Sequence, residues 1–144
     1  MIGLNHAGTG IIIALTVKRP ELAIPLAFVS HFVLDMIPHS RVAHNKTIMA
    51  PYLVVEALGA TILTVVCMVA FPASAPLIMA CAFAAYLPDL LWPFYYGYGV
   101  NLAQTQGFKQ FFAFHKSIQW SETYRGWLVE LLYWCIVIAF LVTY

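Results

Sequence analysis

Two histidines and an aspartate stand four residues apart in the stretch SHFVLDMIPHS, residues 30–40. Successive residues of a helix are rotated by about 100°, so His31, Asp35 and His39 advance by only about 40° per step and share one narrow stripe. Imidazole and carboxylate groups on one stripe can ligate a divalent metal ion, or one can orient the other. Pro38 could end this stripe before His39. The spacing therefore predicts a metal-binding helix or a hydrogen-bonded pair that fixes helix packing.

Histidines and carboxylates recur in the other apolar segments, as His6, Glu56, Asp89 and Glu130, and His115 lies in the adjoining segment 102–120. An ionisable side chain at the centre of a membrane-spanning helix costs roughly 2.5–3.5 kcal/mol on insertion scales, so each one suggests a function. A mixed set of this kind suits Zn²⁺, Mn²⁺ or Fe²⁺ better than a soft metal. We predict a divalent metal site, with zinc expected first, and Glu56 and Glu130 as catalytic carboxylates. The predicted metal ligands are His6, His31, Asp35, His39, Asp89 and His115.

The composition places these residues in a membrane protein. The chain has 144 residues, of which 62% are hydrophobic and 9% charged, with a mean hydropathy of +0.84. A soluble domain of this length needs a more highly charged surface. Apolar runs long enough to approach the roughly 30 Å hydrocarbon thickness occur at 2–17, 22–37, 51–72, 74–95 and 126–143. We expect an all-α integral membrane protein, a single domain over residues 1–144 built as a bundle of about five transmembrane helices.

Segments outside these runs predict further elements. Residues 102–120 alternate aromatic side chains with Lys and Gln, which is typical of an amphipathic helix lying in the membrane interface. Ser121, with Glu122 and Thr123, is expected to cap the last helix. The opening residues MIGLNHAGTGIIIAL lack a basic region and a small-residue cleavage site, so we expect a retained first helix.

Five crossings would bring the predicted ligands to one side of the membrane. Loops 38–50 and 96–125 lie on that side and carry five basic residues, against Lys18 and Arg19 on the other side. The positive-inside rule makes the richer side cytoplasmic, in a multi-pass protein of the cell (inner) membrane. Three of those basic residues could bind an anionic lipid headgroup: Arg41, Lys116 and Arg125.

The motifs resemble two groups of metal-dependent hydrolases. HFVLDMIPH is similar to the H-x3-D…P-x-H helix of the zinc-dependent phospholipase C and S1/P1 nuclease group, with one residue fewer around the proline. That resemblance implies a multi-zinc cluster that hydrolyses phosphoesters. NHAGTG, LPDLL and FHKS resemble, in the same order, three motifs of the integral-membrane, LexA-binding hydrolase family of inner membranes.

The second resemblance implies ligand roles for His6, Asp89 and His115. Two positions depart from that family's pattern. Leu91 stands where the family's second aspartate is expected, and no second histidine follows His115 at the family's spacing. The histidines and aspartate of residues 30–40 would have to replace those missing ligands.

Two classes of function follow from these residues. The first is a membrane-embedded, metal-dependent hydrolase that acts on a lipid or lipid-linked phosphoester at the membrane interface. The second is a non-enzymatic membrane protein that carries protons or metal ions, ligates haem between two histidines, or buries the polar groups against a partner membrane subunit or a second copy. A net charge of +1 gives no attraction for nucleic acid, so membrane lipids are the expected partners.

Overall fold

The computed structural model describes residues 1–40, 46–95 and 105–144, and this part of the chain is mostly helical. Two two-residue strands, β1 (His39–Ser40) and β2 (Glu122–Thr123), complete it. The helical prediction is confirmed. In chain order the helices are α1 (Gly3–Val17), α2 (Pro20–Asp35), α3 (Lys46–Ala70), the 3-10 turn η1 (Pro72–Ser74), α4 (Ala75–Leu90), α5 (Trp92–Tyr95), α6 (Gln106–Ile118) and α7 (Gly126–Thr143).

Three helical stretches are long and apolar enough to cross a membrane: Pro51–Ala70, Pro72–Phe94 and Gly126–Thr143. α1 is apolar but shorter, since its 15 residues extend only about 22 Å. Large apolar side chains cover the outer faces of α3 and α7, including Val66 and Leu132. Such a surface is compatible with a membrane location. The described residues therefore establish an apolar helical protein with three candidate crossings, and the five-crossing bundle remains a prediction.

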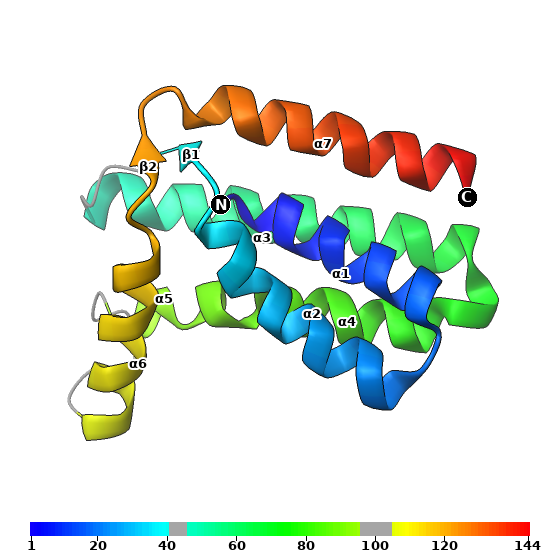
Figure 1. Cartoon of the computed structure of the whole chain (residues 1–144), viewed down its shortest axis with the longest axis horizontal. Coiled ribbons are helices and arrows are strands. Elements are labelled where there is room, and N and C mark those ends of the chain that lie inside the picture. Colours follow the sequence, from blue (N-terminus) through cyan, green and yellow to red (C-terminus); the bar gives the residue numbers. More distant parts are fainter. Residues whose placement is uncertain (41–45, 96–104) are drawn as a thin grey trace.

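α1 is the central helix of the assembly and packs against α2, α3, α4 and α7 (Figure 1). Its contact with α4 is very close because small residues face each other. A Cβ atom added to Gly10 would lie only 2.4 Å from the carbonyl oxygen of Cys81. Ala7 and Ala14 are buried on the face of α1 that carries Gly10, and Ala85 is buried on α4. Small residues of this kind let helix backbones approach where lipid supplies no hydrophobic driving force.

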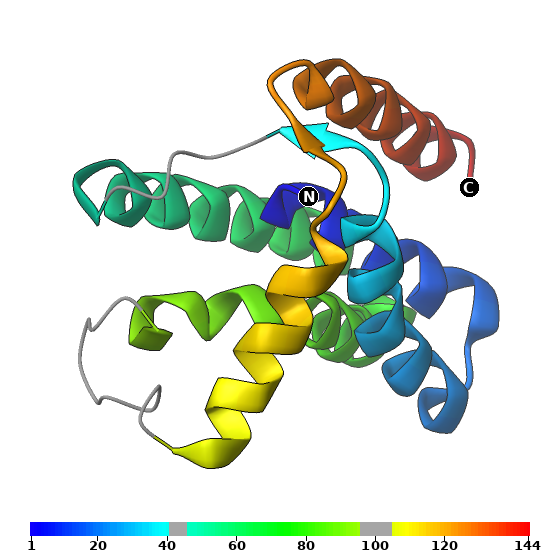
Figure 2. The ribbon, with the colours of Figure 1, turned by 60° about the vertical axis from the view of Figure 1, so that its left-hand side comes forward.

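Several helix ends meet at one end of the bundle. Figures 1 and 2 show the first turn of α1, the last turn of α2, the last turn of α4 and the first turn of α7 at this end, with α6 lying across it. The expected amphipathic helix is thus present, as Gln106–Ile118. The opposite end holds the turn between α1 and α2 and the turn between α3 and α4.

A short parallel pairing of β1 with β2 connects the segment that follows α6 to the segment that follows α2. His39 pairs with Glu122 and Ser40 with Thr123, and the Ser121 hydroxyl donates to the Met36 carbonyl over 3.0 Å. The expected Ser121 cap of the last helix is therefore wrong. α7 begins only at Gly126, and its first turn has no side-chain cap.

Candidate metal centre

The carboxylate of Asp35 lies at the centre of three imidazoles. His6 Nε2 is 3.1 Å from Asp35 Oδ1, His115 Nε2 is 2.9 Å from Oδ2, and His31 Nε2 is 3.3 Å from Oδ2. All four side chains are fully buried. The amino nitrogen of Met1 also contacts Oδ1. A buried carboxylate is tolerated only where donors or cations surround it, and here they do so from several directions.

Asp89 brings a second carboxylate to the same point. Its Oδ1 lies 3.8 Å from His31 Nε2, and its Oδ2 lies 3.8 Å from His6 Nε2. One ligand atom from each of four side chains lies within 4.8 Å of the others, so this group can hold a metal ion. The four side chains are those of His31, Asp35, Asp89 and His115, which we call the His/Asp cluster.

Three of the helices supply the cluster through simple local features. His31 and Asp35 are one turn apart on α2, so both point from the same face of that helix. Asp89 follows Pro88 at the end of α4. His115 is near the end of α6, which lies across the bundle and so directs a buried residue into it. The sequence predicts that polar residues from separate helices converge at one end of the bundle. The four cluster residues and His6 do so.

The tautomer of His31 creates a concentration of lone pairs. Its Nδ1 donates to the Ala85 carbonyl oxygen over 2.8 Å, which leaves a lone pair on Nε2. That Nε2 lies 3.1 Å from His115 Nε2 and also faces the Asp35 carboxylate. A single proton on His115 can serve only one of these acceptors well, whereas one cation would satisfy all of them. The donor set thus fits a metal ion, and the Ala85 bond is of the kind that orients the histidine ligands of metal sites.

The other imidazoles are held mainly by packing. The His6 ring stacks on His31 with centroids 4.0 Å apart, and the Trp92 ring lies 5.2 Å from His115. Phe32 and Phe111 also pack against His115. Within the described part of the chain, Nδ1 of His6 and Nδ1 of His115 have no hydrogen-bond partner. Aromatic walls of this kind exclude water and strengthen electrostatic interactions inside the cluster.

His39 is not brought to the cluster. α2 ends at Asp35, and Pro38 directs the chain into β1. The His39 ring donates from Nδ1 to the Ile37 carbonyl oxygen over 2.8 Å, and its Nε2 is 3.8 Å from Glu122 Oε1. The single stripe expected for residues 31, 35 and 39 therefore holds only for the first two.

The two glutamates predicted as catalytic lie around the first turn of α1. Glu130 accepts from the Ile2 backbone N–H over 3.0 Å and from the Ser40 hydroxyl over 2.9 Å. The Glu56 carboxylate lies near the backbone N–H groups of Gly3 and Leu4. Carboxylates at a helix N-terminus satisfy unpaired N–H groups and the helix dipole. These contacts hold the helix turn that carries His6.

The predicted headgroup-binding residues lie outside the cluster. Lys116 and Arg125 are exposed at the same end of the bundle as the cluster. Arg41 is outside the described residues.

Gln119 also contacts Asp35, and this contact was not predicted from the sequence. Its Nε2 donates to Asp35 Oδ2 over 3.3 Å. The signal was its position four residues after His115, which places both side chains on one side of the chain as α6 ends.

We expect Gln119→Leu to weaken metal binding by roughly tenfold to a hundredfold, the usual effect of removing an outer contact to a ligand. The measurement is a metal titration of the purified protein. Gln110→Leu, on an exposed position of the same helix, is the matched control and should bind like the wild type. Equal affinities for the two variants would contradict the role of Gln119.

The chain matches no known protein family, no curated protein and no solved structure. The interpretation of its function therefore rests on the chemistry of the His/Asp cluster and its surroundings.

Proposed function

We propose that this protein is a membrane-embedded, metal-dependent hydrolase of a lipid or lipid-linked phosphoester. The observation that carries this proposal is the convergence of imidazole nitrogens and carboxylate oxygens at Asp35 within one buried volume. A packing motif needs one pair of such groups, whereas five side chains from four helices meet here.

Zinc is the metal that we propose, with manganese or iron as alternatives. Ligands held about 2.0–2.2 Å from a zinc ion at tetrahedral angles lie about 3.3–3.6 Å from one another. Contacts within the cluster include 2.9 Å between His115 and Asp35 and 3.8 Å between His31 and Asp89, and the four ligand atoms all lie within 4.8 Å of one another. A bound ion would draw the more distant ligand atoms closer. His31, Asp35 and His115 would be the principal ligands, since three protein ligands leave a position open for water. His6 and Asp89 would lie beside them, His6 in contact with Asp35 and Asp89 facing His31.

A bound divalent ion would lower the pKa of a coordinated water and polarise a phosphoryl oxygen. The protein's own residues would orient these partners and exclude bulk water. Asp89 is the most exposed member of the cluster, with 14% of its side chain accessible. It is therefore best placed to meet an incoming substrate and to accept a proton. Glu56 and Glu130 would position His6 by fixing the start of α1.

The surroundings of the cluster favour a lipid substrate. The cluster lies at the end of apolar helices. In a bilayer crossed by these helices, this end would lie where headgroups meet the hydrocarbon layer. Lys116 and Arg125 are exposed at this end and could attract an anionic headgroup. The excess of basic residues in the adjoining loops supports a cytoplasmic orientation of this end.

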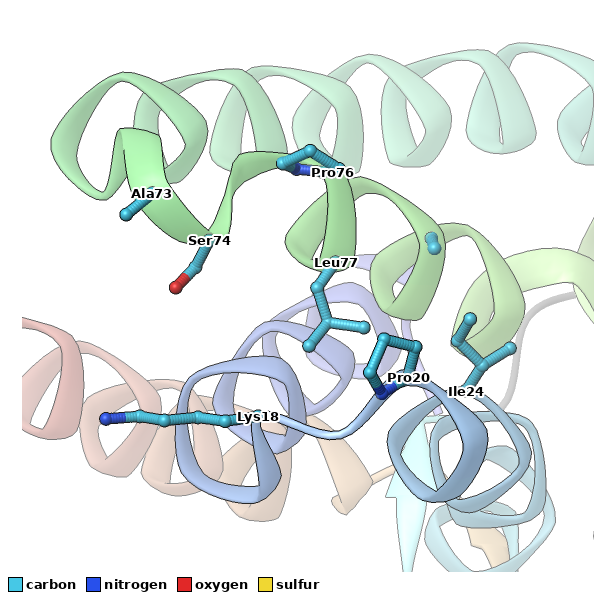
Figure 3. Close-up of a pocket in the computed structure, with 8 residues that line it drawn as sticks. Lys18, Pro20, Ile24, Ala73, Ser74, Pro76 and Leu77 are labelled. Carbon is cyan, nitrogen blue, oxygen red and sulfur yellow. The ribbon is translucent and has the colours of Figure 1, made fainter.

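The opposite end of the bundle argues against a transport pathway. It contains a cavity of about 490 Å³ lined by Lys18, Pro20, Ala73 and other residues of the two turns and of the first turns of α2 and α4 (Figure 3). Between this cavity and the cluster, Ile11, Leu15 and Ile78 are fully buried apolar side chains. Ions crossing from one end to the other would need polar groups along this region.

The metal content of the detergent-purified protein tests the proposal. The wild type should contain about one or more equivalents of zinc, manganese or iron, as ligand sets of this type require, and the His31→Ala/Asp35→Ala variant should contain none. The metal-loaded wild type should also release phosphate or a headgroup from phospholipid or lipid-phosphate substrates. Absence of metal from both proteins after reloading would overturn the metal site. Stoichiometric metal without turnover on any phosphoester would overturn the hydrolase.

A further inference from the structure

An apolar groove runs between α3 and α4 and reaches the His/Asp cluster. It consists of two adjoining cavities of about 270 and 460 Å³, which share Ala57, Tyr86 and Leu90. We call this feature the α3/α4 groove. The smaller cavity includes Asp89 in its lining, and the larger one extends to Met68 and Met79. The groove therefore has one polar end, at a predicted metal ligand, and one apolar end.

The length of the groove matches one leaflet of a membrane. From Asp89 to Met79 the α4 helix rises by about 15 Å, which is half of a hydrocarbon layer of about 30 Å. Both helices that form the groove are long and apolar enough to cross a membrane. Phe83 and Met79, at its margin, are more than half exposed. In a bilayer, the open side of the groove would face lipid chains.

We propose that the α3/α4 groove binds one hydrocarbon chain of the lipid substrate and so places the phosphoester beside Asp89. This inference rests on the proposed function and adds that the substrate enters laterally from the membrane. The polar end supplies the ligands for the head, and the apolar lining supplies the contacts for the chain. Met68 and Met79 are unbranched and adaptable, which suits a flexible chain of variable shape.

The groove has the size of a small-ligand site. Its two cavities, of about 270 and 460 Å³, together fall in the usual range of about 300–1,000 Å³ for such sites. One extended hydrocarbon chain fits its length along α4, and a helix from a second copy is the alternative that the crosslinking experiment detects.

Photocrosslinking tests this inference directly. The probe is phosphatidic acid with a diazirine near the end of one acyl chain, presented in lipid nanodiscs that contain the purified full-length protein. We expect crosslinked peptides to carry the label at groove residues of α3 and α4, such as Thr64 and Met79. Ala57→Trp should reduce this labelling by about tenfold, because the indole fills the junction of the two cavities. Val66→Trp, which adds the same group to an exposed position of α3, is the matched control.

Thr64→Phe provides a second obstruction, deeper in the groove, if Ala57→Trp does not fold. Labelling spread evenly over the outer faces of α3, α4 and α7 would overturn the inference, because it would indicate ordinary surrounding lipid. Crosslinks to a second protein chain in the groove would also overturn it.

Two further readouts separate this inference from the proposed function. The metal content of Ala57→Trp should equal that of the wild type. Its turnover should fall for a long-chain lipid phosphate but remain for a short-chain, water-soluble phosphoester. Equal loss for both substrates would contradict the groove. If the groove of the wild type is labelled but the protein holds no metal and shows no turnover, the acyl-chain site stands and the proposed hydrolase function is refuted.

Discussion

Replacing Asp35 by Asn is expected to remove metal binding and hydrolytic turnover together. Asp35 is fully buried, and its two carboxylate oxygens contact three histidines. The amide supplies one oxygen without a negative charge, and its NH₂ group is a donor facing imidazole nitrogens that must themselves act as ligands. We expect the metal affinity to fall by more than about a hundredfold, the upper limit for changes to outer contacts alone.

The measurement for Asp35→Asn is elemental analysis of the purified variant, combined with phosphate release from the substrate that the wild type turns over. Glu21→Gln is the matched control. It makes the same chemical change on the same helix, at an exposed residue paired with Arg19. His115→Asn provides a second test, should the loss of the buried charge prevent Asp35→Asn from folding. Wild-type metal content and turnover in folded Asp35→Asn would refute the assigned role.

Gly126→Ala is expected to destabilise the whole bundle. A Cβ atom at Gly126 would lie 1.8 Å from the carbonyl carbon of His39 and 2.3 Å from the backbone nitrogen of Ser40. These are backbone atoms of β1, so no change of side-chain rotamer can relieve the overlap. Overpacking commonly costs about 1–3 kcal/mol, and we expect a value near the upper limit. α7 would have to move away from β1, which would disturb the hydrogen bond between Ser40 and Glu130.

A denaturant titration in detergent micelles measures this loss. Gly107→Ala is the control, because a Cβ atom at Gly107 meets no neighbouring atom within 4 Å. Alanine in place of an exposed helical glycine should leave the free energy of unfolding unchanged or raise it slightly. An unfolding midpoint for Gly126→Ala equal to that of Gly107→Ala would show that the approach of α7 to β1 is not close in solution.

The helical class and most of the cluster could be predicted from the sequence. The i, i+4 spacing places His31 and Asp35 together because helix geometry fixes it locally. Asp89 and His115 could be added because apolar segment lengths and turns determine which helix ends lie on the same side. The structure has three candidate crossings, and it still brings His31, Asp35, Asp89 and His115 together. The five-crossing arrangement itself stays a prediction.

The details that failed depend on chain geometry beyond one helix. Pro38 predicts a possible end of the helix, but only the structure shows that the chain then pairs with Glu122–Thr123, which keeps His39 away from the cluster. Ser121 has the composition of a helix cap, yet the Met36 carbonyl competes for its hydroxyl. The catalytic role of Glu56 and Glu130 stays a prediction. Their depth in the apolar segments gives no sign of the contact that the structure adds, in which Glu130 accepts from the Ile2 backbone N–H at the start of α1.

The central position of Asp35 also sets an order of events during synthesis. Its partner His115 lies 80 residues further along the chain. At about 5–20 residues per second, a ribosome needs roughly 4–16 seconds to add that stretch. Until then, the carboxylate has only its earlier partners, which are the amino nitrogen of Met1 and the imidazoles of His6 and His31. Metal loading would therefore be a late step of biogenesis, and a chain stalled before α6 would carry an unfinished centre that quality control could recognise.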